Sequence, residues 1–274
     1  CVRKVMARND SEGIIITHGT DTLQYTAALL SYVFGTDCVP VLLVSSDFPL
    51  EDARANGMAN FMRAVEFIKC REGRGVFVSY RNDRNEEADI YRGTRLLMHQ
   101  PYSARLYPLD GVSFHGKVCY NREASMDRME RPDGQELRLT EDAGNILWIR
   151  PCVGMTYPQA GPQVRAVLHD SYHSGTIAVN AGLEEFAGRM EQAGIPVYLT
   201  GASSGEAEYE TVRMYEQYGI RVLPKMSLIA AYCKLWLALS NDLDVNSIMN
   251  TCIAEDIIQE QRGVIRTDEQ SRRD

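Results

Sequence analysis

The 274-residue chain has 45% hydrophobic and 24% charged residues, an ordinary globular composition that excludes disordered, collagen-like and coiled-coil proteins. Its 29 lysines and arginines against 37 aspartates and glutamates give a net charge of -8, so no positive field exists for a phosphate backbone and we expect no nucleic acid partner. No stretch approaches the ~18 consecutive apolar residues that span a bilayer, so we expect no membrane partner.

Strand and helix patterns alternate through the first eighty residues. The β-branched run Gly13–Thr17 predicts a buried strand, and apolar residues at helical spacing over 23–33 predict a helix that Gly35 ends. The pattern then repeats as a strand over 39–44, a helix over 59–68 and a strand over 75–80. Strands that alternate with helices indicate a parallel sheet covered on both faces.

Regularity fades after residue 80, the stretch 121–142 is dense in charge, and alternation resumes at residue 146. The later predicted elements are strands over 146–149, 166–168, 196–200 and 220–223, helices over 183–193, 206–218, 228–239 and 245–259, and a charged tail over 260–274. We therefore expect an α/β protein with a larger N-terminal parallel-sheet domain (1–125), a linker (126–143) and a smaller C-terminal α/β domain (144–274).

Cysteine usage and the first residue give two further expectations. The seven cysteines are scattered without a Cys-x-x-Cys pair, which favours reduced thiols in a cytoplasmic protein and no zinc centre. Because the sequence starts with cysteine and not methionine, we expect an N-terminally incomplete chain.

The loop after the first predicted strand carries the candidate chemistry. Ligands of open parallel sheets bind beyond the carboxyl ends of the strands, where helix N-termini present unpaired amides. Gly19 lets the backbone approach a ligand, Thr20 and Asp21 supply a hydroxyl and a carboxylate side by side, and Thr22 is placed to cap the next helix. The same residues also fit a purely structural interpretation, in which they only cap that helix.

Three segments resemble one family in the correct order. Thr17–Leu23, followed by Tyr25–Ala27, closely resembles the second signature of the bacterial L-asparaginase family, particularly its cytoplasmic type I branch. The segment 40–60, with its loop Ser45–Leu50, and the stretch Tyr91–Arg95 resemble later segments of that family. The second half of the chain is similar to the family's smaller C-terminal domain, so the resemblance covers nearly the whole chain.

The resemblance implies hydrolysis of the side-chain amide of asparagine to aspartate and ammonia, at a threonine-based site without a metal or cofactor, in a homo-oligomer. It makes Thr20 the second catalytic threonine, hydrogen-bonded to a lysine that Asp21 orients. Asp21 also grips the α-amino group of the amino-acid substrate, asparagine or aspartate, and Gly19 and Ser46 contact that substrate. For Ser46, the interpretation as a turn hydroxyl stays equally open.

Three positions depart from the family pattern. The first signature, a Thr-Gly-Gly-Thr loop with the other catalytic threonine, has no counterpart in residues 1–12. Met98 stands where the family has its lysine, and a thioether cannot titrate. Asn56 replaces an aspartate, which removes a charge beside the site. Loss of the lysine base alone is worth about 10²- to 10⁴-fold in rate.

Other cations do not replace the missing lysine in the sequence. Arg92, Arg95 and Arg105 are expected nearby, but a guanidinium stays protonated and cannot accept a proton from threonine. The five lysines, none of which lies in this loop, are Lys4, Lys69, Lys117, Lys225 and Lys234. Lys117 or another amine within reach of Thr20 would overturn the Met98 assignment.

Two other functions stay open. A catalytically degenerate family member would bind a small amino acid, or act as a regulatory or assembly module, through the same loop. An asparaginase-like subunit would act on another amide, such as a misacylated tRNA, which the acidic composition disfavours. The preference between asparagine and glutamine is also open.

Two further motifs are given a structural interpretation. His169 and His173 flank Asp170 and Ser171, but members of a catalytic triad meet through the fold and not through adjacent positions. Gly201–Gly205 lacks the lysine of a phosphate loop, so a strand-to-helix turn is expected there.

Overall fold

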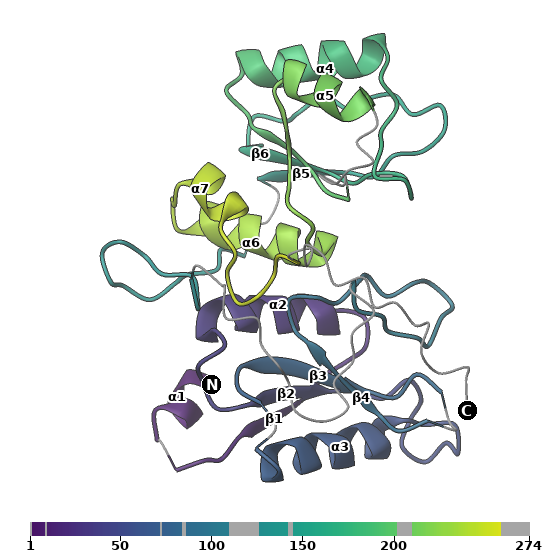
Figure 1. The fold of residues 1–274 in the computed structure, drawn as a ribbon, viewed down its shortest axis with the longest axis vertical. Coiled ribbons are helices and arrows are strands. Elements are labelled where there is room, and N and C mark those ends of the chain that lie inside the picture. The colour runs from purple at the N-terminus through teal and green to yellow at the C-terminus, as the bar shows by residue number, and fades with distance from the viewer. Residues whose placement is uncertain are drawn as a thin grey trace, which may run out of the picture.

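The computed structural model contains two four-stranded sheets, one in each half of the chain, with helix α6 (Leu228–Ser240) between them (Figure 1). It describes residues 2–8, 10–71, 73–83, 86–109, 126–141, 145–201 and 210–258. In this part of the chain, no helix has both the length and the apolar character needed to cross a bilayer. The α/β class and the parallel sheets predicted from the sequence are confirmed.

The N-terminal sheet has the order β1-β2-β3-β4. Its strands are β1 (Ile14–Thr17), β2 (Val41–Val44), β3 (Val76–Tyr80) and β4 (Asp89–Arg92). The first three strands are parallel, with Ile14 opposite Val41 and Val41 opposite Val76, and their predicted positions are confirmed. Strand β4 is not among the predicted elements, and it runs antiparallel to β3 at the edge of this otherwise parallel sheet.

Two helices cover the opposite faces of this sheet (Figure 1). Helix α2 (Leu23–Phe34) ends at Gly35, which adopts a φ of 75° and donates its N–H to Ser31 O at 2.8 Å. Helix α3 (Gly57–Lys69) buries its apolar inner side against β2 and β3. The short helix α1 (Val2–Met6) precedes β1. Both long helices lie where the sequence predicts them.

The second sheet is parallel throughout, in the order β5-β6-β7-β8. Its elements are β5 (Ile146–Ile149), β6 (Ala166–His169), β7 (Val197–Leu199) and β8 (Ile220–Val222), with helices α4 (Ala181–Gln192) and α5 (Glu210–Gln217). Helices α4 and α5 lie on one side of this sheet and α6 lies on the other (Figure 1). These elements confirm the strands and helices predicted between residues 146 and 239.

The last described segment differs from its prediction. Helix α7 (Val245–Asn250) stops early, so the helix expected over 245–259 is wrong. The residues Thr251–Asp256, which we call the C-terminal turn, contain Ala254 and Glu255 with φ values of 51° and 59°. The backbone leaves the helix because the Asp256 carboxylate accepts the Ile253 N–H at 2.9 Å.

The predicted linker packs against both halves of the molecule. Its described part, 126–141, contains no helix or strand. Met129 N donates to Tyr32 O at 2.8 Å, and Arg138 N donates to Asn241 Oδ1 at 2.9 Å. The domain limits remain a prediction. The charged tail and the part of the glycine-containing turn after Gly201 lie outside the described residues.

Candidate active site

The loop between β1 and α2 lies at the carboxyl end of a parallel strand. His18 N donates to Val44 O at 2.8 Å, which extends the hydrogen bonding between β1 and β2 by one residue. The chain then turns into α2, where Leu23 N donates to Thr20 O at 3.4 Å. The first amides of α2 give this end of the helix a partial positive charge, which favours an anionic ligand group.

The His18 ring connects this loop to α2 through hydrogen bonds. Its Nδ1 lies 2.8 Å from Gly19 O, and its Nε2 lies 2.9 Å from the Thr26 hydroxyl. Because a carbonyl can only accept, Nδ1 carries the ring hydrogen and Nε2 accepts from Thr26. No role for His18 was predicted from the sequence, although its place inside the signature was a signal. The ring holds the loop in position.

Thr20 and Asp21 lie together in the loop, as the sequence predicts, and they remain accessible. Thr20 is partly exposed and Asp21 is exposed. In the described part of the chain, neither side chain makes a hydrogen bond or ion pair, although the Asp21 carbonyl accepts from Gln24 Nε2 at 3.3 Å. A hydroxyl and a carboxylate are thus left for a ligand.

Of the two other loop residues, Gly19 and Thr22, only Thr22 differs from its expected role. Gly19 does not adopt a left-handed φ, and a Cβ added there would meet no atom within 4 Å. Its backbone therefore does not require glycine, and open space lies beside it. Thr22 occupies the N-cap position of α2, but its side chain makes no capping hydrogen bond, so the predicted cap is wrong.

The loop after β2 uses Ser46 for its own structure. The Ser46 hydroxyl donates to Phe48 O at 2.6 Å and accepts from Gly57 N at 3.2 Å. These contacts favour its interpretation as a turn hydroxyl.

Ser45 was not singled out from the sequence. Its hydroxyl is buried without a hydrogen-bond partner in the described structure, while its carbonyl accepts from Asn60 Nδ2 at 2.8 Å. Ser45 stands directly after β2, at the same edge of the sheet as Thr20.

Asn56 has a structural reason to differ from the family's aspartate. Its Oδ1 accepts from Asp47 N at 3.0 Å, and its Nδ2 donates to Arg81 O at 2.9 Å. The Asn56 N–H in turn donates to Asp47 Oδ1 at 3.1 Å. An aspartate would place a carboxylate oxygen against the Arg81 carbonyl, and two acceptors cannot bond.

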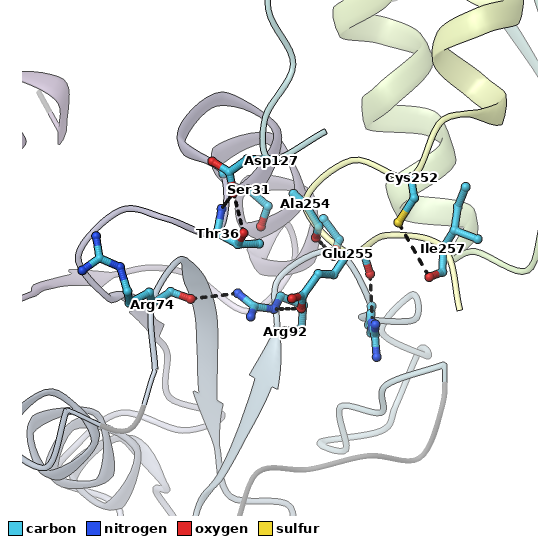
Figure 2. A network of polar contacts seen from close by, with 12 residues as sticks. Ser31, Thr36, Arg74, Arg92, Asp127, Cys252, Ala254, Glu255 and Ile257 are labelled. Carbon is cyan, nitrogen blue, oxygen red and sulfur yellow. Dashed lines mark hydrogen bonds and ion pairs between the residues drawn. The ribbon is translucent and has the colours of Figure 1, made fainter. Parts of the chain in front are cut away.

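The end of β4 is bound to the C-terminal turn (Figure 2). Arg92 is buried, its Nε lies 3.1 Å from Glu255 Oε2, and its Nη1 donates to Arg74 O at 3.2 Å. Its guanidinium also lies 4.3 Å from the centre of the Phe77 ring. Burial raises the pKa of Glu255 above its ordinary value, although Arg92 and Arg95 act in the opposite direction.

The residues that follow β4 also bind the C-terminal turn. Thr94 Oγ1 donates to Ala254 O at 2.9 Å, and Arg95 Nε donates to Glu255 O at 3.0 Å. Arg105 is exposed on the surface. Arg92, Thr94 and Arg95 thus connect the end of β4 to the C-terminal turn.

Met98 lies in an apolar environment. It is partly buried in the cluster between α2 and α6, together with Tyr25 and Trp148. Its sulfur lies 3.7 Å from Nη1 of Arg150, which directly follows β5. The cation in contact with Met98 is therefore an arginine of the second half, which stays protonated and cannot act as a base.

Lys234 is used for structure. It is fully buried, its Nζ lies 2.7 Å from Asp256 Oδ2, and it donates to Thr251 O at 2.5 Å. The Tyr32 hydroxyl lies 2.8 Å from the same carboxylate. Lys117 lies outside the described residues. No hydrogen bond or ion pair to the loop after β1 is found for the other described lysines, Lys4, Lys69 and Lys225.

The carboxyl edge of the second sheet contains no catalytic triad in its described residues. His169 is buried, with Nδ1 2.5 Å from Asp170 O and Nε2 3.1 Å from the Tyr157 hydroxyl. Burial lowers the pKa of His169 and raises the pKa of Tyr157 to about 12, which favours a neutral pair. Ser171 donates its N–H to Asp170 Oδ1 at 2.9 Å and makes no contact with the ring.

These features define an α/β protein of two sheets, with its candidate ligand loop at the carboxyl edge of the first sheet. A family model described as "Asparaginase, N-terminal" matches residues 2–105. L-asparaginase 1 of Escherichia coli is 25% identical over 88% of this chain and 72% of its own length. Residues 2–105 therefore match the N-terminal domain of the asparaginase family, and the chain is similar to L-asparaginases over most of its length.

Two further comparisons show that the chain is similar to an amidotransferase subunit and to a solved L-asparaginase. A glutamyl-tRNA(Gln) amidotransferase subunit of Haloquadratum walsbyi is 26% identical over 91% of this chain, which spans only 59% of the length of that relative. The solved L-asparaginase of Thermococcus kodakarensis has a TM-score of 0.69 and 22% identity, with 94% of this chain and 80% of that chain covered. The solved structure supports the same fold.

Proposed function

We propose that the chain is an asparaginase-type amidohydrolase that converts L-asparagine and water to L-aspartate and ammonia. The observation that supports this is the accessible Thr20–Asp21 pair at the positive end of α2, inside the matched segment. The Asp21 carboxylate binds the α-ammonium group of the substrate. Thr20 acts as the second catalytic threonine. The amide C–N bond breaks, a C–O bond to the water oxygen forms, and the nitrogen leaves as ammonia.

The surroundings of this pair complete the proposed binding site. The open space beside Gly19 admits the substrate. Ser46 keeps its role as a substrate contact in the proposal, although its hydroxyl is engaged within its own loop. The Ser45 hydroxyl lies buried at the same edge and has no hydrogen-bond partner among the described residues. We place the protein in the cytoplasm, in keeping with its scattered cysteines, which form no Cys-x-x-Cys pair.

Met98 favours a second candidate function, in which the loop binds the amino acid without hydrolysing it. The thioether cannot replace a lysine base, and the Met98 contact with Arg150 adds a cation that cannot accept a proton. Loss of such a base costs about 10²- to 10⁴-fold in rate. Under this function, aspartate and asparagine bind at the same loop with no ammonia release.

The relatives that are named as subunits of glutamyl-tRNA(Gln) amidotransferases suggest a third candidate, a chain that releases ammonia within a larger assembly. The net charge of -8 disfavours direct contact with tRNA by this chain. Glutamine is therefore tested beside asparagine as the amide substrate.

Ammonia release from asparagine and from glutamine, measured with the purified chain, tests these functions. We expect release that Thr20→Ala and Asp21→Asn abolish, whereas the surface controls Thr156→Ala and Asp10→Asn retain it. Unchanged release in Thr20→Ala would remove Thr20 from the mechanism. A rise in melting temperature with aspartate, lost in Asp21→Asn, together with no ammonia from either amide, would establish binding without hydrolysis.

A further inference from the structure

A cavity of about 690 Å³ lies at the end of α2 that is remote from the candidate ligand loop. The loop precedes Leu23 at the start of the helix, whereas its last two residues, Val33 and Phe34, line the cavity. At 1.5 Å per residue, the two ends of this helix are about 16 Å apart. The volume is within the range of cavities that hold small organic ligands, and none of the functions proposed above uses it.

The cavity has an apolar wall that α1, α2 and the linker build together. Its side chains are those of Met6, Val33, Phe34, Met129 and Leu137. The linker is held against α2 by two hydrogen bonds, from Met129 N to Tyr32 O at 2.8 Å and from Thr36 N to Asp127 Oδ1 at 2.7 Å. These bonds fix the position of the wall in the absence of any ligand.

Charged side chains also line the cavity. Three guanidinium groups, those of Arg3, Arg128 and Arg131, stand against the two carboxylates of Glu130 and Glu136. The lining therefore has one positive charge in excess, in a chain whose net charge is -8. This local excess of positive charge favours a ligand with a single negative charge.

The three guanidinium groups differ in how many of their donors are in use. Arg131 donates through both Nε and Nη2 to Asp133, at 3.0 and 2.6 Å. Arg128 donates only through Nε, to Glu130 at 2.8 Å, so both of its Nη groups have no partner within the described structure. Two such groups can donate parallel hydrogen bonds to the two oxygens of one carboxylate. Arg128 is therefore the arginine that can bind a further anion without giving up its ion pair.

We propose that this cavity binds a small monocarboxylate with an apolar body. Arg128 holds the carboxylate through its Nη groups, and the body packs on the apolar wall. The thioethers of Met6 and Met129 adapt to aliphatic and aromatic groups alike. This inference does not depend on the proposed function, because the cavity and the candidate ligand loop lie at opposite ends of α2.

Calorimetric titration of the full chain with 3-phenylpropanoate tests the site. We expect a Kd of about 1 mM or below. Acetate lacks the apolar body, and 3-phenylpropylamine has the same body with a positive charge, so each should bind at least about 10-fold more weakly. Arg128→Gln should weaken binding of 3-phenylpropanoate at least about 10-fold. The matched control is Arg54→Gln, because Arg54 has the same exposed side-chain fraction of 55%, also pairs with a carboxylate two residues away and lies outside the cavity. It should bind like the parent chain.

Cys38 provides a second measurement, because this half-buried residue lines the cavity. At ten times its Kd, 3-phenylpropanoate should slow the alkylation of Cys38 by iodoacetamide about 10-fold. Cys152 is exposed outside the cavity and should react at an unchanged rate, as peptide mass spectrometry measures. Thermal melts followed by circular dichroism verify that each variant is folded.

Three outcomes would overturn the proposal: no binding by the parent chain, no protection of Cys38, or an Arg128→Gln variant that binds like the parent. Tighter binding of phenylalanine than of 3-phenylpropanoate would overturn it as well. In that case Glu130 or Glu136 would bind an ammonium group, and the cavity would be a site for zwitterions.

Discussion

The loop after β1 and the C-terminal turn are both rich in polar groups, but they use these groups differently. In the turn, Asp256 is fully buried and is contacted by Lys234, Tyr32 and the Ile253 N–H. In the loop, Asp21 is exposed and has no such partner among the described residues. The two carboxylates therefore differ in what remains for a ligand. Burial and internal hydrogen bonding identify the turn as structural and leave the loop as the candidate binding site.

The largest expected effect is on the buried pair of the C-terminal turn. Asp256→Asn leaves the Lys234 ammonium buried without its counter-charge, which should lower the free energy of unfolding by about 3–5 kcal/mol. Urea denaturation measures this change. The matched control is Asp21→Asn, which should change stability by less than about 0.5 kcal/mol because Asp21 is exposed. Equal losses in the two variants would contradict the distinction between turn and loop.

A second comparison uses two glycines of the resembled segments. A Cβ at Gly93 would lie 2.6 Å from Ser31 Oγ and 2.9 Å from Ala27 O, whereas one at Gly19 would meet nothing within 4 Å. Gly93→Ala should therefore cost about 1–3 kcal/mol through overpacking between strand and helix. Gly19→Ala should leave the midpoint of urea unfolding unchanged. A Gly93→Ala variant as stable as Gly19→Ala would show that α2 can shift to accommodate a methyl group.

The difference between these regions also shows what the sequence could reveal. The strands β2 and β3 are apolar runs, and their burial follows from local pattern alone. Strand β1 is only partly buried because it lies at the edge of the sheet, so the prediction of a buried strand there is wrong. Strand β4 escaped prediction because Asp89–Arg92 is short and ends in an arginine, a residue type that is usually exposed. Arg92 is buried only because Glu255, far along the chain, pairs with it.

The candidate site was predictable to a similar extent. The position of Thr20 and Asp21 after a parallel strand follows from the sequence. The hydrogen bonds of Ser46 with Phe48 and Gly57 do not follow from the sequence, because they depend on how the loop folds back onto α3. The same holds for Met98, whose contact with Arg150 requires the second half of the chain to lie beside the first.

A third prediction concerns how the loop is held. Thr26→Val removes the hydroxyl that donates to His18 Nε2 and should cost about 1 kcal/mol of stability, the ordinary net value of a hydrogen bond. Because the loop is held less firmly, affinity for aspartate should fall as well, as measured by calorimetric titration. The control Thr156→Val alters an exposed threonine and should change neither quantity. Loss of stability with unchanged affinity would show that the His18 contact does not position the ligand loop.

The smallest expected effect is a pH dependence that only the C-terminal turn should show. Since burial raises the pKa of Glu255 in the folded protein, the folded chain binds this proton more readily than the unfolded chain does. The contribution of Glu255 to stability is therefore complete below its unfolded pKa, about 4.3, and is lost as the pH rises through its folded pKa.

Urea denaturation across this range compares the parent chain with Glu255→Gln, which cannot titrate but can still accept from Arg92. The parent should lose stability relative to the variant as the pH increases, and the difference should become constant once Glu255 is ionised. The attraction of Arg92 and Arg95 favours the charged form and opposes this trend. A difference of the opposite sign would therefore mean that the ion pair outweighs burial, and that the C-terminal turn is stabilised by the charge of Glu255.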